Sequence, residues 1–380
     1  MIARPWTDDL PKCRNTFFEP HNGLDAARFI MQRMAAEILL PPPSSSNTDE
    51  EIRDRLRNAF VLVEKAYIEN YDGMIAERTS LQYQLQTLNE TQNCDSILSR
   101  LKEIDQHLSG GATVVIALVH NSKLFVANVG ETRALLGKTD QNSVLRVVQL
   151  TVDHSLNNED ELLRLSQLGL DVNKLRNANY LGNQTGTRCL GNYLVKGLYR
   201  AFPGLGGALS EPVLAAPEIH GPILLDHSCR FLVLVSAGVY KRIQEIKGSS
   251  EQTNKQLAQI IVENFRQQTD FNKISQSVLQ QVEEEFVAYC MRNNLTPKHS
   301  HMTLLIRNFN FIPTVNEAIN DSIKTDQINR RQQNASPSDI YPNGRQYEKD
   351  KKIKGYVDFS CYFENVAKAR KNGTLPDFIK

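Results

Sequence analysis

Two apolar runs separated by a short polar break constrain this chain more than any other stretch of its sequence. Residues 112–119 read ATVVIALV, residues 124–129 read LFVANV, and the four residues His120–Lys123 lie between them. Both runs are short, rich in β-branched residues and bounded by turn residues, which favours strands over a buried helix. We therefore expect a hairpin with a four-residue loop. Near-continuous apolar strands are typical of a layered sandwich, in which both faces of a sheet are covered. The spacing of the residues alone, however, predicts no more than an ordinary hairpin in the core.

The composition is that of an ordinary soluble protein. The chain has 380 residues, enough for one large domain with extensions or for two domains. Its net charge of +1 gives no global attraction to nucleic acid. No run approaches the ~20 apolar residues of a membrane helix, and residues 1–10 lack the apolar core of a secretory signal. The six cysteines have no regular spacing and are interpreted as free thiols of a reducing cytosol or nucleus. We therefore expect a cytoplasmic protein with neither nucleic-acid nor membrane partners.

Helical patterns precede the hairpin. Residues 24–40 have apolar side chains near helical spacing and are followed by three prolines. Thr48 and Glu51 form a capping-box pattern that opens an amphipathic helix extending to Tyr67. A further helix carries its apolar stripe from Ile97 to Leu108. Helices that lead into a buried hairpin indicate a helix layer laid on a sheet.

Strands and helices also follow the hairpin, and then the pattern fades. We expect strands at 133–136, 145–150, 231–236 and 302–306, helices at 153–168, 255–265 and 271–289, and loop with short strands at 177–207. Residues 313–353 are polar and without period, which is typical of a linker.

An aromatic stripe returns near the C-terminus. Phe359, Tyr362, Phe363 and Val366 are spaced i, i+3, i+4 and i+7, the spacing of one helix face, and Asp358 is a suitable N-cap. Because this helix lies beyond a linker, its apolar face either folds back on the main domain or docks on a partner.

Three local patterns could carry chemistry, and each has a simpler interpretation. The adjacent residues Asp153 and His154 are interpreted as a helix start rather than an acid–base pair. His299 and His301 share one strand face and suit a metal, but no third ligand is near, which favours solvated histidines. The basic run 349–354 lacks interleaved aromatics and is interpreted as solvated linker.

Five motifs in order support a family resemblance. They are SGGAT at 109–113, VANVGETRA at 126–134, LTVDH at 150–154, FLVLVSAG at 231–238 and SHMTLLI at 300–306. Together they resemble the metal-dependent serine/threonine phosphatases of the 2C class. The resemblance runs from about Asn22 to Arg307. It implies an α+β fold in which a β-sandwich is flanked by helices in α-β-β-α layers.

The family's catalytic residues do not carry over. The resemblance implies two divalent cations held by carboxylates, with a bridging water as nucleophile. Three positions at which the family has metal-binding aspartates hold other residues here, and a fourth holds a different acid. The positions of this degenerate site are Asn22 with Gly23, Ala237 with Gly238, Ser300, and Glu131, which keeps a carboxylate. The resemblance therefore implies a pseudophosphatase with no catalytic residue, bound metal or cofactor.

A branch of inactive members fits better still. The matching stretches are WTDDLP at 6–11, EDELLRLSQLGL at 159–170, PEIHG at 217–221, MTLLIRNF at 302–309 and YVDF at 356–359. They resemble the adaptors that bind the transforming-growth-factor-β-activated kinase, a MAP kinase kinase kinase, and promote its autophosphorylation. The resemblance implies kinase-binding roles for Tyr356, Val357, Asp358, Phe359, Tyr362 and Phe363. It also implies apoptosis-inhibitor or ubiquitin-linked signalling proteins as further partners.

These inferences divide the chain into four parts. We expect a poorly ordered N-terminus at 1–21, because too few residues precede Asn22 for the two or more strands that the family has there. A pseudophosphatase domain at 22–312, a flexible linker at 313–354 and a kinase-binding helix at 355–380 follow. The sandwich is expected to lack N-terminal strands and to expose part of an edge.

Two other functions compete with the adaptor. One is a working metal-dependent phosphatase with alternative ligands such as Glu131 and His301. The other is an isolated scaffold whose tail folds back on its own domain.

Overall fold

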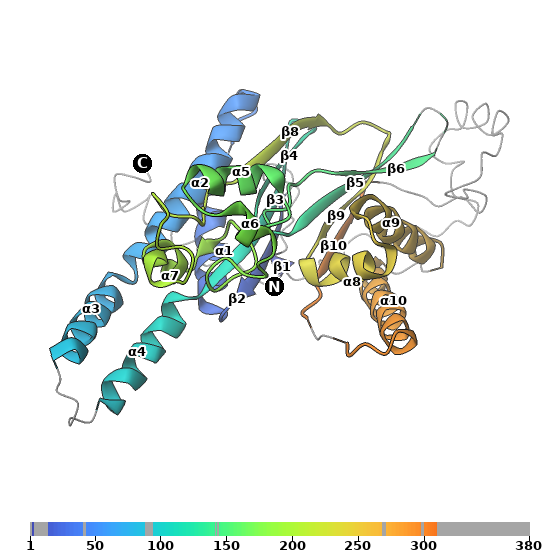
Figure 1. Ribbon diagram of the computed structural model, residues 1–380. Coiled ribbons are helices and arrows are strands. Elements are labelled where there is room, and N and C mark those ends of the chain that lie inside the picture. Colours follow the sequence, from blue (N-terminus) through green and yellow to red (C-terminus); the bar gives the residue numbers. More distant parts are fainter. Residues whose placement is uncertain are drawn as a thin grey trace.

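The described part of the molecule is built in four layers. The computed structural model describes residues 2–3, 14–40, 43–87, 94–140, 142, 144–267, 271–297 and 300–309. In these residues, two antiparallel sheets pack face to face and helices cover both outer faces (Figure 1). The α-β-β-α arrangement expected from the sequence is confirmed.

Each sheet draws its strands from distant parts of the chain. The first sheet has the order β1 (Ile2–Ala3), β2 (Arg14–His21), β3 (Gly111–His120), β4 (Lys123–Val129) and β8 (Glu218–Leu224), and β7 (Leu190–Gly191) pairs with β3. The second has the order β10 (Leu304–Asn308), β9 (Cys229–Val235), β5 (Arg133–Thr139) and β6 (Leu145–Gln149). The side chains of β3 and β4 are buried on both faces, one against helices and one against the second sheet.

The loop of the central hairpin is shorter than expected. His120 pairs with Lys123, so only Asn121 and Ser122 remain in the turn. Both have positive φ, 47° and 58°, as a type I′ turn requires. The prediction of a four-residue loop is therefore wrong, because polarity at His120 and Lys123 does not prevent backbone pairing.

Strand β2 corrects the expectation for the N-terminus. All eight of its residues pair with β3, so poor order over 1–21 is wrong for Arg14–His21. The physical reason is its alternation: Phe17 packs between the sheets and Phe18 packs under the helices. Among the described residues before Asn22, β1 has only two residues. The described residues before Asn22 thus contain one full strand. Two full strands there would have contradicted the prediction that the sheet is reduced.

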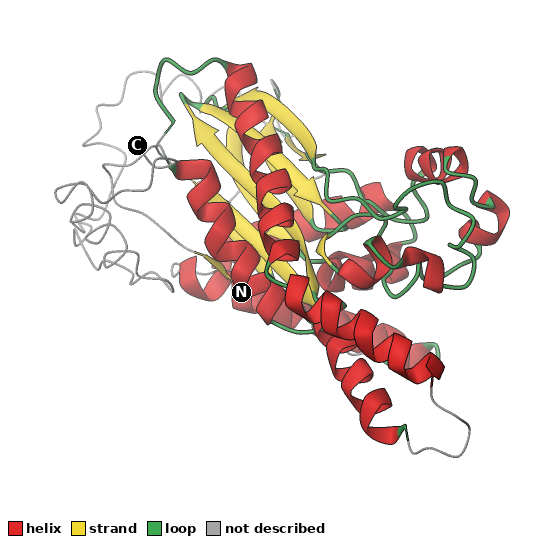
Figure 2. Ribbon diagram, turned by 90° about the vertical axis from the view of Figure 1, so that its left-hand side faces the viewer, coloured by secondary structure: helices red, strands yellow, loops and turns green. Residues whose placement is uncertain are grey.

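The first sheet is covered by α1 (Asp25–Leu39) and α2 (Asp49–Glu69) (Figure 2). The capping box predicted at Thr48 and Glu51 is confirmed, with both reciprocal hydrogen bonds present. Beyond them, α3 (Asp72–Thr87) and α4 (Asp95–Leu108) form an arm that projects from the body. Helix α3 was not expected, since none of its residues is buried and it has no apolar stripe to recognise.

The second sheet is covered by α8 (Ala237–Lys247), α9 (Ser250–Gln267) and α10 (Phe271–Arg292). The last two were expected, with shorter bounds. Helix α8 was not, and it begins directly at the end of the FLVLVS strand.

A separate small core lies between β6 and β8 in the chain. It joins α5 (Glu159–Gln167), α6 (Val172–Arg176), α7 (Tyr193–Lys196) and the 3-10 turn η1 (Tyr199–Ala201). The helix expected from Asp153 begins only at Glu159, because Asn158 accepts hydrogen bonds from the first helical N–H groups.

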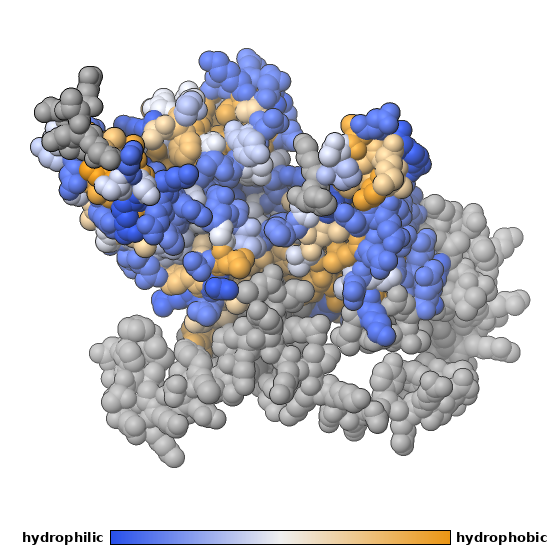
Figure 3. All heavy atoms as spheres, turned by 90° about the horizontal axis from the view of Figure 1, so that it is seen from below, coloured by the Kyte–Doolittle hydropathy of each residue, from blue (hydrophilic) through white to orange (hydrophobic). Residues whose placement is uncertain are grey.

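Seen from below, hydrophilic residues cover most of the described surface, and apolar side chains show between them in separate groups (Figure 3). Across the described residues, no helix is both long and apolar enough to cross a membrane. The linker at 313–354 and the C-terminal helix at 355–380, with its kinase-binding residues Tyr356 to Phe363, lie outside the described residues.

Candidate functional site

Four of the six positions that the sequence predicts for a degenerate metal site meet at one corner of the sandwich. Ala237 and Gly238 open α8, and Ser300 precedes β10. Gly238 packs closely against Ser300 and His301. A Cβ added to Gly238 would lie 2.0 Å from the His301 carbonyl oxygen and 3.1 Å from Ser300 Oγ. Arg242, also on α8, donates to the carbonyl oxygens of Gly238 and Ser300, at 3.2 and 3.3 Å.

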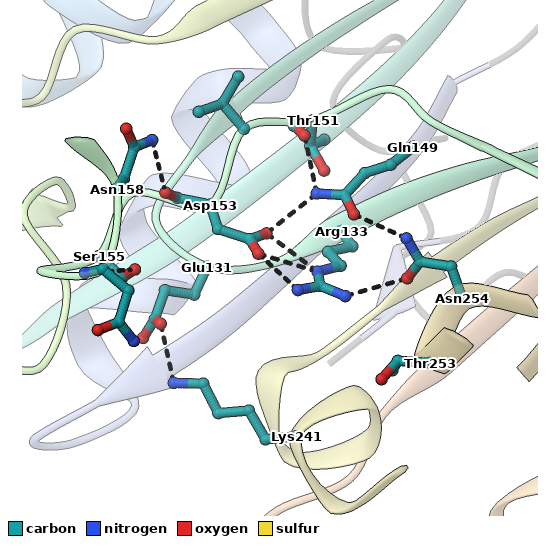
Figure 4. Close-up of polar contacts among 12 residues, drawn as sticks. Glu131, Arg133, Gln149, Thr151, Asp153, Ser155, Asn158, Lys241, Thr253 and Asn254 are labelled. Carbon is teal, nitrogen blue, oxygen red and sulfur yellow. Dashed lines mark hydrogen bonds and ion pairs between the residues drawn. The ribbon is translucent and has the colours of Figure 1, made fainter. Parts of the chain in front are cut away.

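Glu131 reaches the same corner from the turn between β4 and β5. Its Oε1 lies 2.8 Å from Nζ of Lys241 on α8, and its Oε2 accepts a hydrogen bond from Thr185 Oγ1 at 3.2 Å. Figure 4 shows the lysine extending from α8 toward the carboxylate. Only 8% of Glu131 is exposed. Glu131 was the one carboxylate predicted from the sequence to remain at the degenerate site. It therefore already has the ammonium group of Lys241 beside it.

Glu19 is a second carboxylate at this corner, and it was not predicted from the sequence as a site residue. It lies on β2, and its Oε2 accepts the backbone N–H of Ala237 at 3.4 Å. The pKa of Glu19 is raised to about 7, mainly by burial and also by the charge of Glu131, while the Ala237 hydrogen bond and the charge of Lys241 oppose the rise. An acid directly after the apolar pair Phe17-Phe18 was the only local signal, and nothing in the sequence indicated what it would face.

Asn22 and Gly23 lie elsewhere. Asn22 has a left-handed backbone with φ 54°, and its Nδ2 donates to the Ser109 carbonyl oxygen at 3.1 Å. Both residues line a surface pocket with Tyr67 and Tyr71, which none of the other four positions lines. The structure therefore brings together Glu131, Ala237, Gly238 and Ser300, and not Asn22 or Gly23.

The donors at the corner do not fit two divalent cations. Magnesium and manganese need several oxygen ligands with net negative charge. Here the described carboxylates are Glu19 and Glu131, and an ammonium group already occupies one side of Glu131. Within the described ranges, no group of three or more His, Cys, Asp or Glu side chains could hold a metal ion. His301 is exposed, and His299 lies outside the described residues.

A buried arginine holds the β5 side of the corner. The Arg133 guanidinium pairs with Asp153 at 2.6 Å, donates to Asn254 Oδ1 at 3.0 Å and lies 3.7 Å from the centre of the Tyr240 ring. Gln149 donates to the same Asp153 carboxylate at 3.2 Å. Figure 4 shows these groups converging from the second sheet, the loop after it and α9. Asp153 is thus a partner of Arg133, and its predicted role as a helix cap is wrong.

Comparison with known proteins agrees with this fold. The model of the family described as protein phosphatase 2C matches residues 26–294. A Caenorhabditis elegans protein, "TGF-beta-activated kinase 1 and MAP3K7-binding protein 1", is 26% identical over 237 residues, which cover 60% of this chain and 55% of that protein. "Probable protein phosphatase 2C 32" of Oryza sativa subsp. japonica is 31% identical over 137 residues, covering 36% of this chain and 30% of that protein.

A solved structure is also similar. The crystal structure of serine-threonine phosphatase 2C from Toxoplasma gondii aligns with a TM-score of 0.48 at 14% identity, covering 77% of this chain and 83% of that one. The chain spans about half the length of the C. elegans relative and less than a third of the rice relative.

Proposed function

This chain belongs to the protein phosphatase 2C family, and on that premise we propose that it is a non-catalytic adaptor that binds and activates a kinase. The kinase is a MAP kinase kinase kinase of the TGF-β-activated type, and binding promotes its autophosphorylation. The adaptor would act in the cytoplasm, in stress, innate-immune, NF-κB and TGF-β-type signalling. Apoptosis-inhibitor or ubiquitin-linked proteins are further partners of the sandwich domain.

The Lys241–Glu131 ion pair is the observation that carries the non-catalytic part of the proposal. Phosphatase chemistry of this family requires carboxylates that hold divalent cations. At this corner the ammonium of Lys241 lies 2.8 Å from Glu131, and neither Ala237 nor Ser300 has a carboxylate. A metal-activated water lacks the family's set of ligands at this corner, which supports the proposal that Ala237 and Ser300 are lost ligand positions. Asn22, the third position implied by the resemblance, lies outside the corner.

The adaptor part rests on the C-terminal sequence and on a relative. The YVDF stretch at 356–359, followed by Tyr362 and Phe363, has the spacing of an aromatic helix face. Aromatic anchors on one helix face suit docking in an apolar groove of a partner. The C. elegans relative is named as a kinase-binding protein. Docking would favour the kinase's active conformation, which is a shift of population and needs no catalysis by the adaptor.

Co-expression with a kinase domain tests this function. The full chain and a MAP kinase kinase kinase domain from the same organism are co-expressed, and co-purification and activation-loop phosphorylation are measured. We expect the wild type to bind and activate, and Phe359→Ala to do neither. Phe378→Ala is the matched control, because Phe378 lies beyond Gly373 and Pro376, where the predicted helix ends. It should behave as the wild type.

Failure of all three chains to bind would contradict the adaptor function. Protease protection of the tail in the isolated wild type would instead indicate that the tail folds back on its own domain. Manganese-dependent release of phosphate from a phosphopeptide would overturn the non-catalytic part and favour the phosphatase alternative.

A further inference from the structure

Two acidic side chains lie at the corner formed by Ala237, Gly238 and Ser300. Glu131 is buried, and Glu19 lies on the neighbouring edge of the first sheet with its carboxylate at the start of α8. Burial, and then the charge of Glu131, raise the pKa of Glu19. Like charges brought together out of water are costly unless a cation compensates them. In a metal-binding relative of this fold a cation would supply that compensation, so this chain needs another source of positive charge.

The position of Lys241 on α8 provides this positive charge. Lys241 follows Ala237 by four residues, and side chains four apart lie on the same helix face. Helical side chains also lean toward the N-terminus, so a lysine at 241 covers the turn that begins at 237. Because Ala237 has only a methyl group, the space toward Glu131 is open to the lysine. Its ammonium lies 2.8 Å from Glu131 Oε1.

We propose that the ε-ammonium of Lys241 takes the place of a metal cation, as a built-in counter-ion that holds the turn of Glu131 against α8 and keeps divalent cations out. Ala237, at the position where the resemblance implies an aspartate, and Lys241, one turn later, act together in this proposal. The first removes a ligand, and the second supplies a charge that cannot dissociate. Ordering of this corner is then independent of metal concentration.

The surroundings of Glu131 distinguish this pair from an ordinary surface ion pair. Exposed pairs contribute little, because water screens both partners and the side chains lose freedom. Here 46% of the lysine side chain but only 11% of the glutamate side chain is exposed. Thr185 Oγ1 also donates to Glu131 and fixes the carboxylate toward the corner. Removing the lysine would leave a buried carboxylate without its cation, which costs more than the pair itself contributes.

Thermal unfolding of the full chain, with and without millimolar MnCl2, tests the proposal. Without metal, Lys241→Met should lower the Tm by about 2 to 4 °C. Manganese should raise the Tm of Lys241→Met and leave the wild type unchanged, because two carboxylates without a cation attract one. Lys247→Met is the matched control, since Lys247 is an exposed lysine on the same helix. It should show neither effect.

Two further variants keep the test decisive. Lys241→Arg keeps the positive charge and should behave as the wild type. Glu131→Gln combined with Lys241→Met should unfold at a higher Tm than Lys241→Met alone, because the uncompensated charge is gone. Equal Tm values for Lys241→Met and Lys247→Met without metal, or an equal manganese response in the wild type and Lys241→Met, would overturn the proposal. None of these readouts involves the kinase, so their outcome and that of the adaptor experiment are independent.

Discussion

At the scale of single residues, His154 shows how an enclosed polar group acquires a pH dependence. Its side chain is fully buried, and Nδ1 accepts the Gly130 N–H at 3.1 Å, so the neutral ring carries its proton on Nε2. The pKa of His154 is lowered to about 3, mainly by burial and also by the charge of Arg188. Arg164 acts in the same direction, while Glu161 partly opposes it.

We expect His154 to make the fold less stable in mild acid. The unfolded chain protonates this histidine near its ordinary pKa of 6.5, but the folded chain does so only near 3. Protons therefore bind the unfolded state preferentially, and stability is lost as the pH falls from about 6.5 toward 3. Urea unfolding at pH 7 and pH 5 should show a loss about 1 to 2 kcal/mol smaller in His154→Asn than in the wild type. Equal losses in both proteins would contradict this prediction.

At the scale of elements, the central hairpin is closed by a strained turn. Ser122 has φ 58°, a left-handed conformation that serine adopts at a cost and glycine adopts freely. Its carbonyl oxygen accepts the Leu225 N–H, a bond that does not depend on the side chain. The turn tolerates the strain because β3 and β4 pair without interruption from Val114 and Val129 up to the turn.

We expect Ser122→Gly to stabilise the protein by about 0.5 to 1 kcal/mol, because glycine relieves this strain. The free energy of unfolding from urea titration is the measurement. Ser210→Gly is the control, since Ser210 is an exposed loop serine without a positive φ. It should be neutral or slightly destabilising. A loss of stability in Ser122→Gly would show that the serine side chain has a role of its own in the turn.

At the scale of the whole molecule, β2 joins the layers. Phe17 packs among side chains of both sheets, while Phe18 packs in the core between the first sheet and α1 and α2. The N-terminal strand therefore contributes to both the core between the sheets and the core under the helices.

We expect Phe17→Ala to lower the free energy of unfolding by about 3 to 5 kcal/mol, the usual effect of removing a buried phenyl ring. Val148→Ala on the edge strand β6 is the control, because 46% of Val148 is exposed, and it should have a much smaller effect. Equal effects in urea unfolding would mean that β2 is not an integral part of the core.

The family resemblance added the α-β-β-α layers, whereas local patterns were sufficient for the two strands of the central hairpin and the capping box at Thr48. Each of these signals lies within a few residues, where side-chain period and capping chemistry act directly. Resemblance added the positions of Glu131, Ala237, Gly238 and Ser300. Helix α3 was not predicted from the sequence, because a helix without a buried face has no apolar period.

Only the tertiary structure decided which side chains lie next to one another at the corner formed by Ala237, Gly238 and Ser300. Glu19 and Ala237 are 218 positions apart, and no local pattern connects them. Lys241 looks like any exposed helical lysine until the turn of Glu131 is placed beside α8. Asn22, grouped with the others by resemblance, instead bonds to Ser109. The physical reason is that charge compensation depends on distance in space, which the packing of two sheets and a helix sets, while the sequence records only order along the chain.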